Sequence, residues 1–299
     1  MTGYQCKDCP RNCGAVRGSE EKKTVGYCRA PEKPKVARAA LHFWEEPCIS
    51  GEEGSGTVFF SGCNLRCVYC QNAEIANGMA GKEITVKRLA EIFLELQEKG
   101  ANNINLVTPS HYYRQIKEAL LLVKEKLHIP VIANTSSYDS VAQLKEMEGL
   151  IDIYLADYKY ADAELAKRYS HAPDYPEIAA MALKEMFRQV GEPVFSEDGK
   201  MKRGMIVRHL LLPGQKEDSK KVLRFLYDMF GDSVFISIMN QYTPMVKADD
   251  FPELKRRITE EEYEEVVEYA ISLGIENGFI QEGETAEESF IPAFDGEGV

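Results

Sequence analysis

The segment GCNLRCVYCQN, residues 62–72, carries the most specific pattern in the chain. It contains Cys63, Cys67 and Cys70 with the spacing C-x3-C-x2-C, directly after the apolar, strand-like run 57–61. Soft thiolate ligands select zinc or iron–sulfur clusters, and three thiolates this close can hold three irons of a [4Fe–4S] cube. The chain has no cysteine after Cys70, so the fourth iron would keep an open coordination position, where metal sites do chemistry. The alternative is a structural zinc site with a distant fourth ligand.

The net charge and the hydropathy of the chain speak against some classes of protein. The 299 residues carry 36 Lys and Arg against 48 Asp and Glu, a net charge of −12, which speaks against a broad basic face for nucleic acid. No apolar run is long enough to span a membrane, and the N-terminus lacks the apolar stretch of an export signal. We therefore expect a cytoplasmic protein, in which clustered cysteines are metal ligands more often than disulfides.

A second cysteine set precedes the motif. Segment 1–30 is short and polar, so it needs a metal or a cross-link to fold. Its four cysteines could fill a closed site, which would be structural zinc or an ordinary iron–sulfur centre, with free thiols as the third possibility: Cys6, Cys9, Cys13 and Cys28. Cys48 stands alone, and we interpret it as a small buried residue.

The rest of the chain alternates between strand-like and helix-like patterns. Strands are predicted at 57–61, 103–108, 130–136, 151–160, 205–212 and 234–240, and helices at 85–99, 111–127, 140–148, 176–190, 219–230 and 259–274. Thr85 and Gly100 are the expected caps of the first helix. Six βα units predict an α/β fold, either an open doubly wound sheet or a partial barrel. Both bind ligands at the carboxyl ends of the strands.

The motif resembles the cluster-binding sequence of the radical S-adenosylmethionine (SAM) superfamily. The resemblance covers nearly the whole chain and is closest to the branch related to pyruvate formate-lyase activating enzyme, through the segments VFFSGCNLRCVYCQN (58–72), NLVTPSHY (105–112), YLADYKY (154–160), RHLLLPG (208–214) and ISIMNQYTP (236–244). It implies a partial (β/α)6 TIM-type barrel at 49–299, preceded by a Cys-rich segment and linker at 1–48. It also implies that a [4Fe–4S] cluster on Cys63, Cys67 and Cys70 binds and cleaves SAM.

Polar residues at the predicted strand ends are the candidate SAM contacts. They are Thr108, Pro109, Ser110, Asn134, Ser136, Asp157, Lys159 and Arg208. Thr108–Ser110 stand where many members have a Gly-rich motif, and the D-x-K pattern of Asp157 and Lys159 resembles activating enzymes. Each residue also has a structural interpretation: Asn134 and Ser136 could cap a helix, and Asp157 and Lys159 could be an ion pair. Alternation allows only one of Arg208 and His209 to face inward, and His209 could be a core histidine.

The resemblance predicts a radical SAM enzyme, whose 5′-deoxyadenosyl radical abstracts hydrogen from a substrate. One candidate substrate is a glycine of a partner glycyl radical enzyme, and the other is a small molecule or peptide. The expected electron donor is a protein such as flavodoxin or ferredoxin. The rival from another class is a non-catalytic iron–sulfur or metal-binding module.

Overall fold

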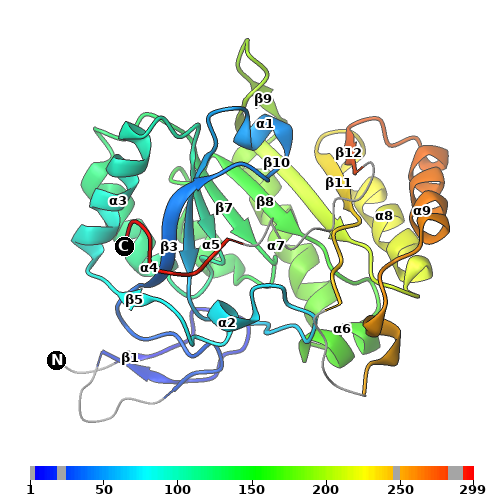
Figure 1. Cartoon of the computed structure of the whole chain (residues 1–299), viewed down its shortest axis with the longest axis horizontal. Helices are drawn as coiled ribbons and strands as arrows, with labels where there is room; N and C mark the ends of the chain where they lie inside the picture. Colours follow the sequence, from blue (N-terminus) through cyan, green and yellow to red (C-terminus); the bar gives the residue numbers. More distant parts are fainter. Residues whose placement is uncertain (1–3, 19–24, 245–249, 282–291) are drawn as a thin grey trace.

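The computed structural model describes residues 4–18, 25–244, 250–281 and 292–299. A twisted sheet runs through the middle of the molecule (Figure 1), with α3 (Val86–Glu98) and α4 (Tyr113–Val123) on one side and α8 (Lys216–Phe230) and α9 (Glu260–Leu273) on the other. A separate two-stranded sheet of β1 (Tyr4–Gln5) and β2 (Val16–Arg17) lies at the lower end in this view, near α2 (Ala73–Ala76).

In the described part of the chain, seven consecutive strands of the main sheet run parallel to one another. In spatial order they are β4 (Ser55–Phe60), β6 (Ile104–Val107), β7 (Val131–Thr135), β8 (Ile153–Asp157), β10 (Met201–Leu210), β11 (Phe235–Met239) and β12 (Gly278–Ile280). The first six are the predicted strands. Their order follows the chain without the reversal that marks a doubly wound sheet, so the predicted partial barrel is confirmed.

The helices predicted from periodicity also form, with ends that shift by a few residues. Besides α3, α4, α8 and α9 they include α5 (Val141–Glu146) and α7 (Tyr175–Val190). The Thr85 side chain accepts a hydrogen bond from the amide of Arg88, as expected of an N-cap. Lys99 is the C-cap, and Gly100 follows it with φ +85°, so the helix ends one residue earlier than predicted.

Several elements were not predicted. Strand β3 (Lys35–His42) pairs antiparallel with β4, and β5 (Lys82–Glu83) pairs with β3. Residues 35–42 therefore belong to the main sheet, although the sequence places them in a linker. The short α1 (Pro47–Ser50) and α6 (Ala163–Ser170), β12 and the β9 (Val194–Phe195) hairpin arm also escaped prediction.

The inner face of the sheet is apolar at one end and polar at the other. Ile49 of α1 packs in one cluster with Ile132, Ile153, Leu155 and Ile206, from β7, β8 and β10. Side chains alternate along a strand, so the residues between them (Ala133, Tyr154, Ala156, Met205 and Val207) join the larger core under the helices. Two positions further along each strand, the same inner face carries Asn134, Asp157 and Arg208. Helix α1 therefore closes the barrel beneath a layer of polar side chains.

His209 is a core residue, and Arg208 is the inward one. The His209 ring donates from Nδ1 to the carbonyl of Tyr158 (2.8 Å), and Nε2 accepts from Ser219 Oγ (2.8 Å). Burial lowers the pKa of His209 from 6.5 to about 4. As the pH falls, His209 is therefore protonated near pH 6.5 in the unfolded chain but only near pH 4 in the folded chain. The unfolding free energy contributed by this difference is lost as the pH falls through this window.

We expect the unfolding free energy of the wild type to fall between pH 7 and pH 5. In His209→Gln this fall should be smaller by about 2 kcal/mol. Urea unfolding at both pH values measures this difference. The matched control is His128→Gln, which makes the same substitution at an exposed position. An equal loss in His209→Gln and wild type contradicts the assignment.

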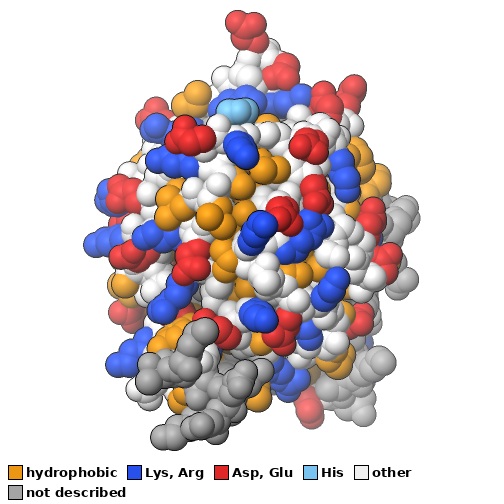
Figure 2. All heavy atoms as spheres, turned by 90° about the vertical axis from the view of Figure 1, so that its left-hand side faces the viewer, with side chains coloured by type: hydrophobic (Ala, Val, Ile, Leu, Met, Phe, Trp, Pro, Cys, Tyr) orange, Lys and Arg blue, Asp and Glu red, His pale blue; other side chains and the backbone are white. Residues whose placement is uncertain are grey.

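Among the described residues, no helix combines the length and apolar character needed to cross a lipid bilayer. On the face shown in Figure 2, Lys and Arg side chains are interspersed with Asp and Glu, and the described residues gather into no broad basic surface there.

Candidate active site

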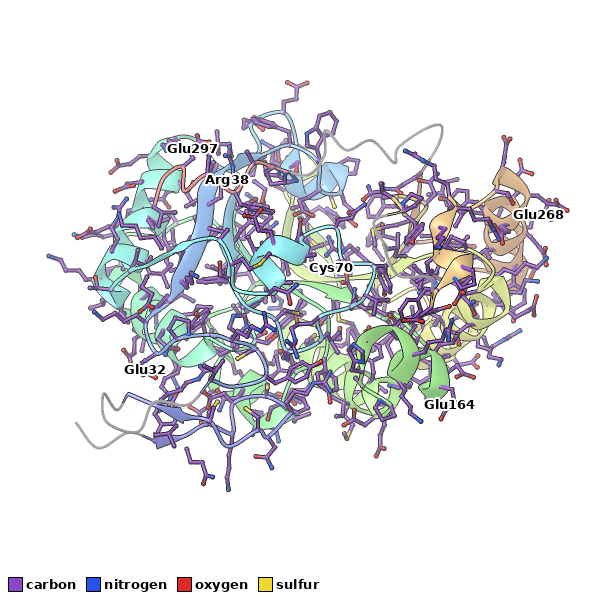
Figure 3. All side chains as sticks on the ribbon, turned by 60° about the horizontal axis from the view of Figure 1, so that its bottom comes forward. Glu32, Arg38, Cys70, Glu164, Glu268 and Glu297 are labelled. Atoms are coloured by element: carbon purple, nitrogen blue, oxygen red, sulfur yellow. The ribbon has the colours of Figure 1, made fainter. Side chains whose placement is uncertain are left out.

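A cavity of about 290 Å³ opens at the carboxyl ends of the parallel strands. Cys63, Cys67 and Cys70 line it together with side chains from the ends of β6, β7, β8, β10 and β11. Cys70 lies near the centre of the molecule in Figure 3, whereas the labelled glutamates lie at its periphery. The motif and the strand ends, far apart in sequence, thus share one cavity.

The three cysteines of the motif are half-buried. Burial raises the pKa of Cys63, and it raises the pKa of Cys70 to about 12. The positive charge of Lys159 acts in the opposite direction on both thiols. Two donors point at sulfur: the Leu65 amide lies 3.4 Å from Cys63 Sγ, and Ser170 Oγ lies 2.9 Å from Cys67 Sγ. Thiolates here need a strongly positive partner, which bound iron would supply.

The structure also places these sulfurs suitably for a cluster. Within the described ranges, no three Cys, His, Asp or Glu side chains converge as a ready site for one metal ion. A four-iron cube requires no such convergence, because each thiolate binds a different iron. Three soft ligands facing one cavity, with N–H and O–H donors at two sulfurs, fit such a cube.

The N-terminal segment forms hydrogen bonds to the start of the cluster loop, the segment 63–70 that carries the three motif cysteines. Three consecutive loop residues each bond to it: the Cys63 amide donates to Cys28 O (3.2 Å), Arg11 Nε donates to Asn64 O (2.7 Å), and Tyr27 Oη donates to Leu65 O (3.1 Å). The Tyr27 ring lies between the guanidinium groups of Arg11 and Arg66, 4.1 and 4.0 Å from the ring centre. The loop that carries the predicted ligands is therefore held by Arg11, Tyr27 and Cys28.

Gly62 is required by this contact. Its φ is +96°, and a Cβ at this position would lie 2.5 Å from the carbonyl oxygen of Cys28. Only glycine combines that backbone conformation with so close an approach.

The four N-terminal cysteines lie close together. Cys6, Cys9 and Cys28 are buried, and Cys13 is exposed. Burial, together with the three other cysteines, raises the pKa of Cys9 to about 12. Arg17, itself buried, donates from Nη2 to Cys28 Sγ (3.0 Å). Among the residues that the structure describes, however, these cysteines do not converge as a ready site for one metal ion, and the second centre stays a prediction.

A charged network forms the floor of the cavity, centred on Arg208. Its Nη1 lies 3.1 Å from Glu45 Oε2, its Nε lies 3.1 Å from Asp157 Oδ1, and its Nη2 donates to Asn134 Oδ1 (2.5 Å). The other oxygen of Glu45 accepts from Asn105 Nδ2 (2.9 Å) and Asn134 Nδ2 (3.2 Å). Every nitrogen of the Arg208 fork therefore has a partner.

Asp157 and Lys159 form an ion pair that also faces the cavity, with Nζ 2.7 Å from Oδ2. Burial alone would raise the pKa of Asp157, but the charges of Lys159 and Arg208 outweigh burial and hold it below its usual value. The pKa of Lys159 is raised, because the attraction of Asp157 outweighs burial. Both groups are charged near neutral pH, so a carboxylate ligand can find a cation here.

Six of the eight predicted strand-end residues line the cavity: Thr108, Asn134, Ser136, Asp157, Lys159 and Arg208. Thr108 has φ +59°, so this β-branched residue adopts the left-handed turn that a glycine would adopt without strain. Pro109 and Ser110 are not brought to the cavity, and Ser110 is buried with its Oγ 3.4 Å from Thr135 Oγ1. Ser140, rather than Asn134 or Ser136, is the N-cap of the following helix.

The sequence did not identify Glu45 or Gln71 as cavity residues. Glu45 precedes α1 in a segment interpreted as a linker, and only the pairing of β3 with β4 carries it into the barrel. Gln71 directly follows the last motif cysteine and donates to the carbonyl of Gln241 (2.8 Å). In the sequence, only its position next to the motif could have identified Gln71 as a cavity residue.

The Radical SAM superfamily model matches residues 57–226, more than half of the chain. The chain belongs to the radical SAM superfamily. Membership implies a [4Fe–4S] cluster and SAM as cofactors, and the cavity with three cysteines at the strand ends is where this radical SAM protein would hold them.

The relatives of this radical SAM protein are distant. It is 28% identical over 275 residues to the uncharacterized protein MJ0674 of Methanocaldococcus jannaschii, a match that covers 89% of this chain and 74% of that one. Among solved structures, Streptococcus suis SuiB bound to precursor peptide SuiA matches with a TM-score of 0.52 at 14% identity, over 74% of this chain and 47% of SuiB. The chain thus spans about half the length of SuiB, and the likeness concerns the fold.

A further structure, methylornithine synthase (PylB), matches with a TM-score of 0.45 at 14% identity, over 82% of this chain and 72% of that chain.

Proposed function

We propose that this protein cleaves SAM reductively, with a [4Fe–4S] cluster on Cys63, Cys67 and Cys70, and that the resulting radical abstracts hydrogen from a substrate. The observation that carries the proposal is the single cavity in which the three thiols face the charged strand ends. When bound, the cluster supplies one electron, which splits SAM into methionine and the 5′-deoxyadenosyl radical. The protein's own residues bind, orient and shield these groups.

Two of those residues suit the methionine part of SAM. Lys159 lines the cavity and its positive charge acts on the thiols of Cys63 and Cys70, so it can receive the SAM carboxylate, while Asp157 keeps it ionised and in place. Arg208 and Glu45 form the polar floor against which the ligand packs. Thr108, Asn134 and Ser136 offer hydroxyl and amide groups for the rest of SAM.

For the substrate, we favour a small molecule or a short peptide over a glycine of a partner glycyl radical enzyme. Polar side chains that converge on one cavity are typical of a metabolite pocket. Trp44 and Phe43 are 57% and 48% exposed, and Trp44 lines both this cavity and a smaller adjoining one. An aromatic rim of this kind can hold an extended ligand at the entrance.

The proposal also includes an electron donor and a second metal centre. The electron comes from a reducing protein such as flavodoxin or ferredoxin. The cysteines at 6, 9, 13 and 28 hold a second centre, either structural zinc or iron–sulfur, which stabilises the segment that grips the cluster loop.

Metal analysis after anaerobic reconstitution tests these assignments. We expect about four irons per chain from the motif, together with either one zinc or additional iron at the N-terminus. The EPR signal of the reduced cluster should change when SAM is added, because SAM occupies the open iron. A signal that SAM leaves unchanged supports instead the rival, a cluster fully ligated by protein that has no catalytic role.

A further inference from the structure

A chain of hydroxyl groups leads to the sulfur of Cys67. Ser170 Oγ lies 2.9 Å from Cys67 Sγ, the Tyr160 hydroxyl lies 2.8 Å from Ser170 Oγ, and the Tyr69 hydroxyl lies 2.6 Å from that of Tyr160. The three residues come from the motif loop, the turn after β8 and the last position of α6. Tyr69 is 6% exposed, Tyr160 1% and Ser170 0%, so bulk water does not compete for their hydroxyl groups.

Chemistry fixes the direction of these hydrogen bonds. A sulfur that binds iron is a thiolate and has no proton to donate, so Ser170 must donate to Cys67. Ser170 has then used its only proton, and its oxygen must accept from Tyr160. By the same reasoning the Tyr160 oxygen accepts from Tyr69. The three hydroxyl groups therefore form a one-way chain, and hydrogen bonds in series strengthen one another.

Ser170 is held in this position by the backbone around it. Arg11 donates to the carbonyls of Ser170 (3.0 Å) and His171 (2.5 Å) at the end of α6. The amide of Val68, in the cluster loop, donates to the carbonyl of Tyr169 (2.9 Å). The end of the helix and the loop are thus joined on both sides of the Ser170–Cys67 contact.

We propose that Tyr69, Tyr160 and Ser170 are positioning residues that raise the reduction potential of the cluster bound to Cys67, a proposal that rests on the function proposed above. Reduction adds negative charge to the cluster, and a hydrogen-bond donor at a ligand sulfur stabilises that charge. Hydrogen bonds to the sulfurs are among the features that set the potentials of iron–sulfur clusters. The chain eases the electron uptake that must precede SAM cleavage.

The test is a redox titration of the reconstituted protein by EPR, following only the signal that changes when SAM is added. We expect Ser170→Ala to lower the ratio of reduced to oxidised cluster at a fixed potential about tenfold, which is about 59 mV for one electron. Tyr160→Phe should have a smaller effect and Tyr69→Phe the smallest, because each acts through one more hydrogen bond. The matched control is Tyr154→Phe, a buried tyrosine whose hydroxyl donates to Gln189 instead, and its potential should not move.

The graded order separates a hydrogen-bond chain from general loosening of the site, which would not follow the number of bonds to sulfur. Unchanged potentials in both Ser170→Ala and Tyr160→Phe overturn the inference, as does a shift of equal size in Tyr154→Phe. Tyr160→Phe keeps the ring and its packing, so it serves if Ser170→Ala fails to fold. Wild-type protein without a SAM-responsive signal would instead refute the underlying function.

Discussion

Replacement of Cys67 by alanine should remove the SAM-responsive cluster. Three cysteines line the cavity, and each is needed for one iron, so the loop holds no spare thiolate. We expect the variant to bind about four fewer irons per chain than the wild type after reconstitution, and to lose the EPR signal that SAM alters. Iron analysis and EPR of the reduced protein measure both effects.

Cys48→Ala is the matched control for this experiment. Cys48 packs against the apolar cluster around Ile49, at the end of the barrel away from the motif. Its loss should leave the iron content and the signal unchanged. Retention of a SAM-responsive cluster in Cys67→Ala, or its loss in Cys48→Ala, would show that the ligands are misassigned.

Among the variants proposed here, Arg208→Ala should produce the largest loss of unfolding free energy. The Arg208 side chain is 13% exposed, and its partners Glu45 and Asp157 are 10% and 17% exposed. Removing the guanidinium leaves the poorly solvated carboxylate of Glu45 without a nearby cation, and it leaves Asp157 with Lys159 alone. Breaking a buried pair in this way costs about 3–5 kcal/mol of unfolding free energy, measured by urea unfolding at pH 7.

The matched control is Arg224→Ala. Arg224 and Asp228 are 53% and 62% exposed on α8, and such surface pairs contribute at most about 1 kcal/mol. The cost of Arg208→Ala should also shrink at acidic pH, because Arg208 helps to hold the pKa of Asp157 below its usual value, and this contribution is lost once Asp157 is protonated. Similar losses in the two variants would mean that the floor network contributes no more than a surface pair.

The regular part of the barrel could be predicted from the sequence because local pattern and tertiary environment agree there. The run 130–136 is apolar enough to read as a strand on its own, and the 85–99 helix has both an apolar face and the Thr85 cap. Short elements were missed because they carry little local signal. Helix α1 has four residues, and β3 is identified by its pairing with β4 rather than by its own alternation.

The residues of the site also divide into those that the sequence predicts and those that it does not. Strand-end residues such as Asp157 and Arg208 were found because parallel strands end at one edge. Glu45 was missed because its position depends on β3, an element the sequence did not predict. Ser110 was expected at the cavity, but the left-handed turn at Thr108 is followed by a buried serine that bonds to Thr135. Which side chain faces inward after an irregular turn depends on backbone torsions that spacing does not encode.

The central claim is that this site cleaves SAM with an electron from its cluster. The measurement that tests it most directly is the product analysis of reconstituted protein incubated anaerobically with SAM and dithionite. We expect 5′-deoxyadenosine and methionine in equal amounts, formed only when protein and reductant are both present. No 5′-deoxyadenosine above the level of the Cys67→Ala variant, with a cluster demonstrably bound and reduced, would contradict the account.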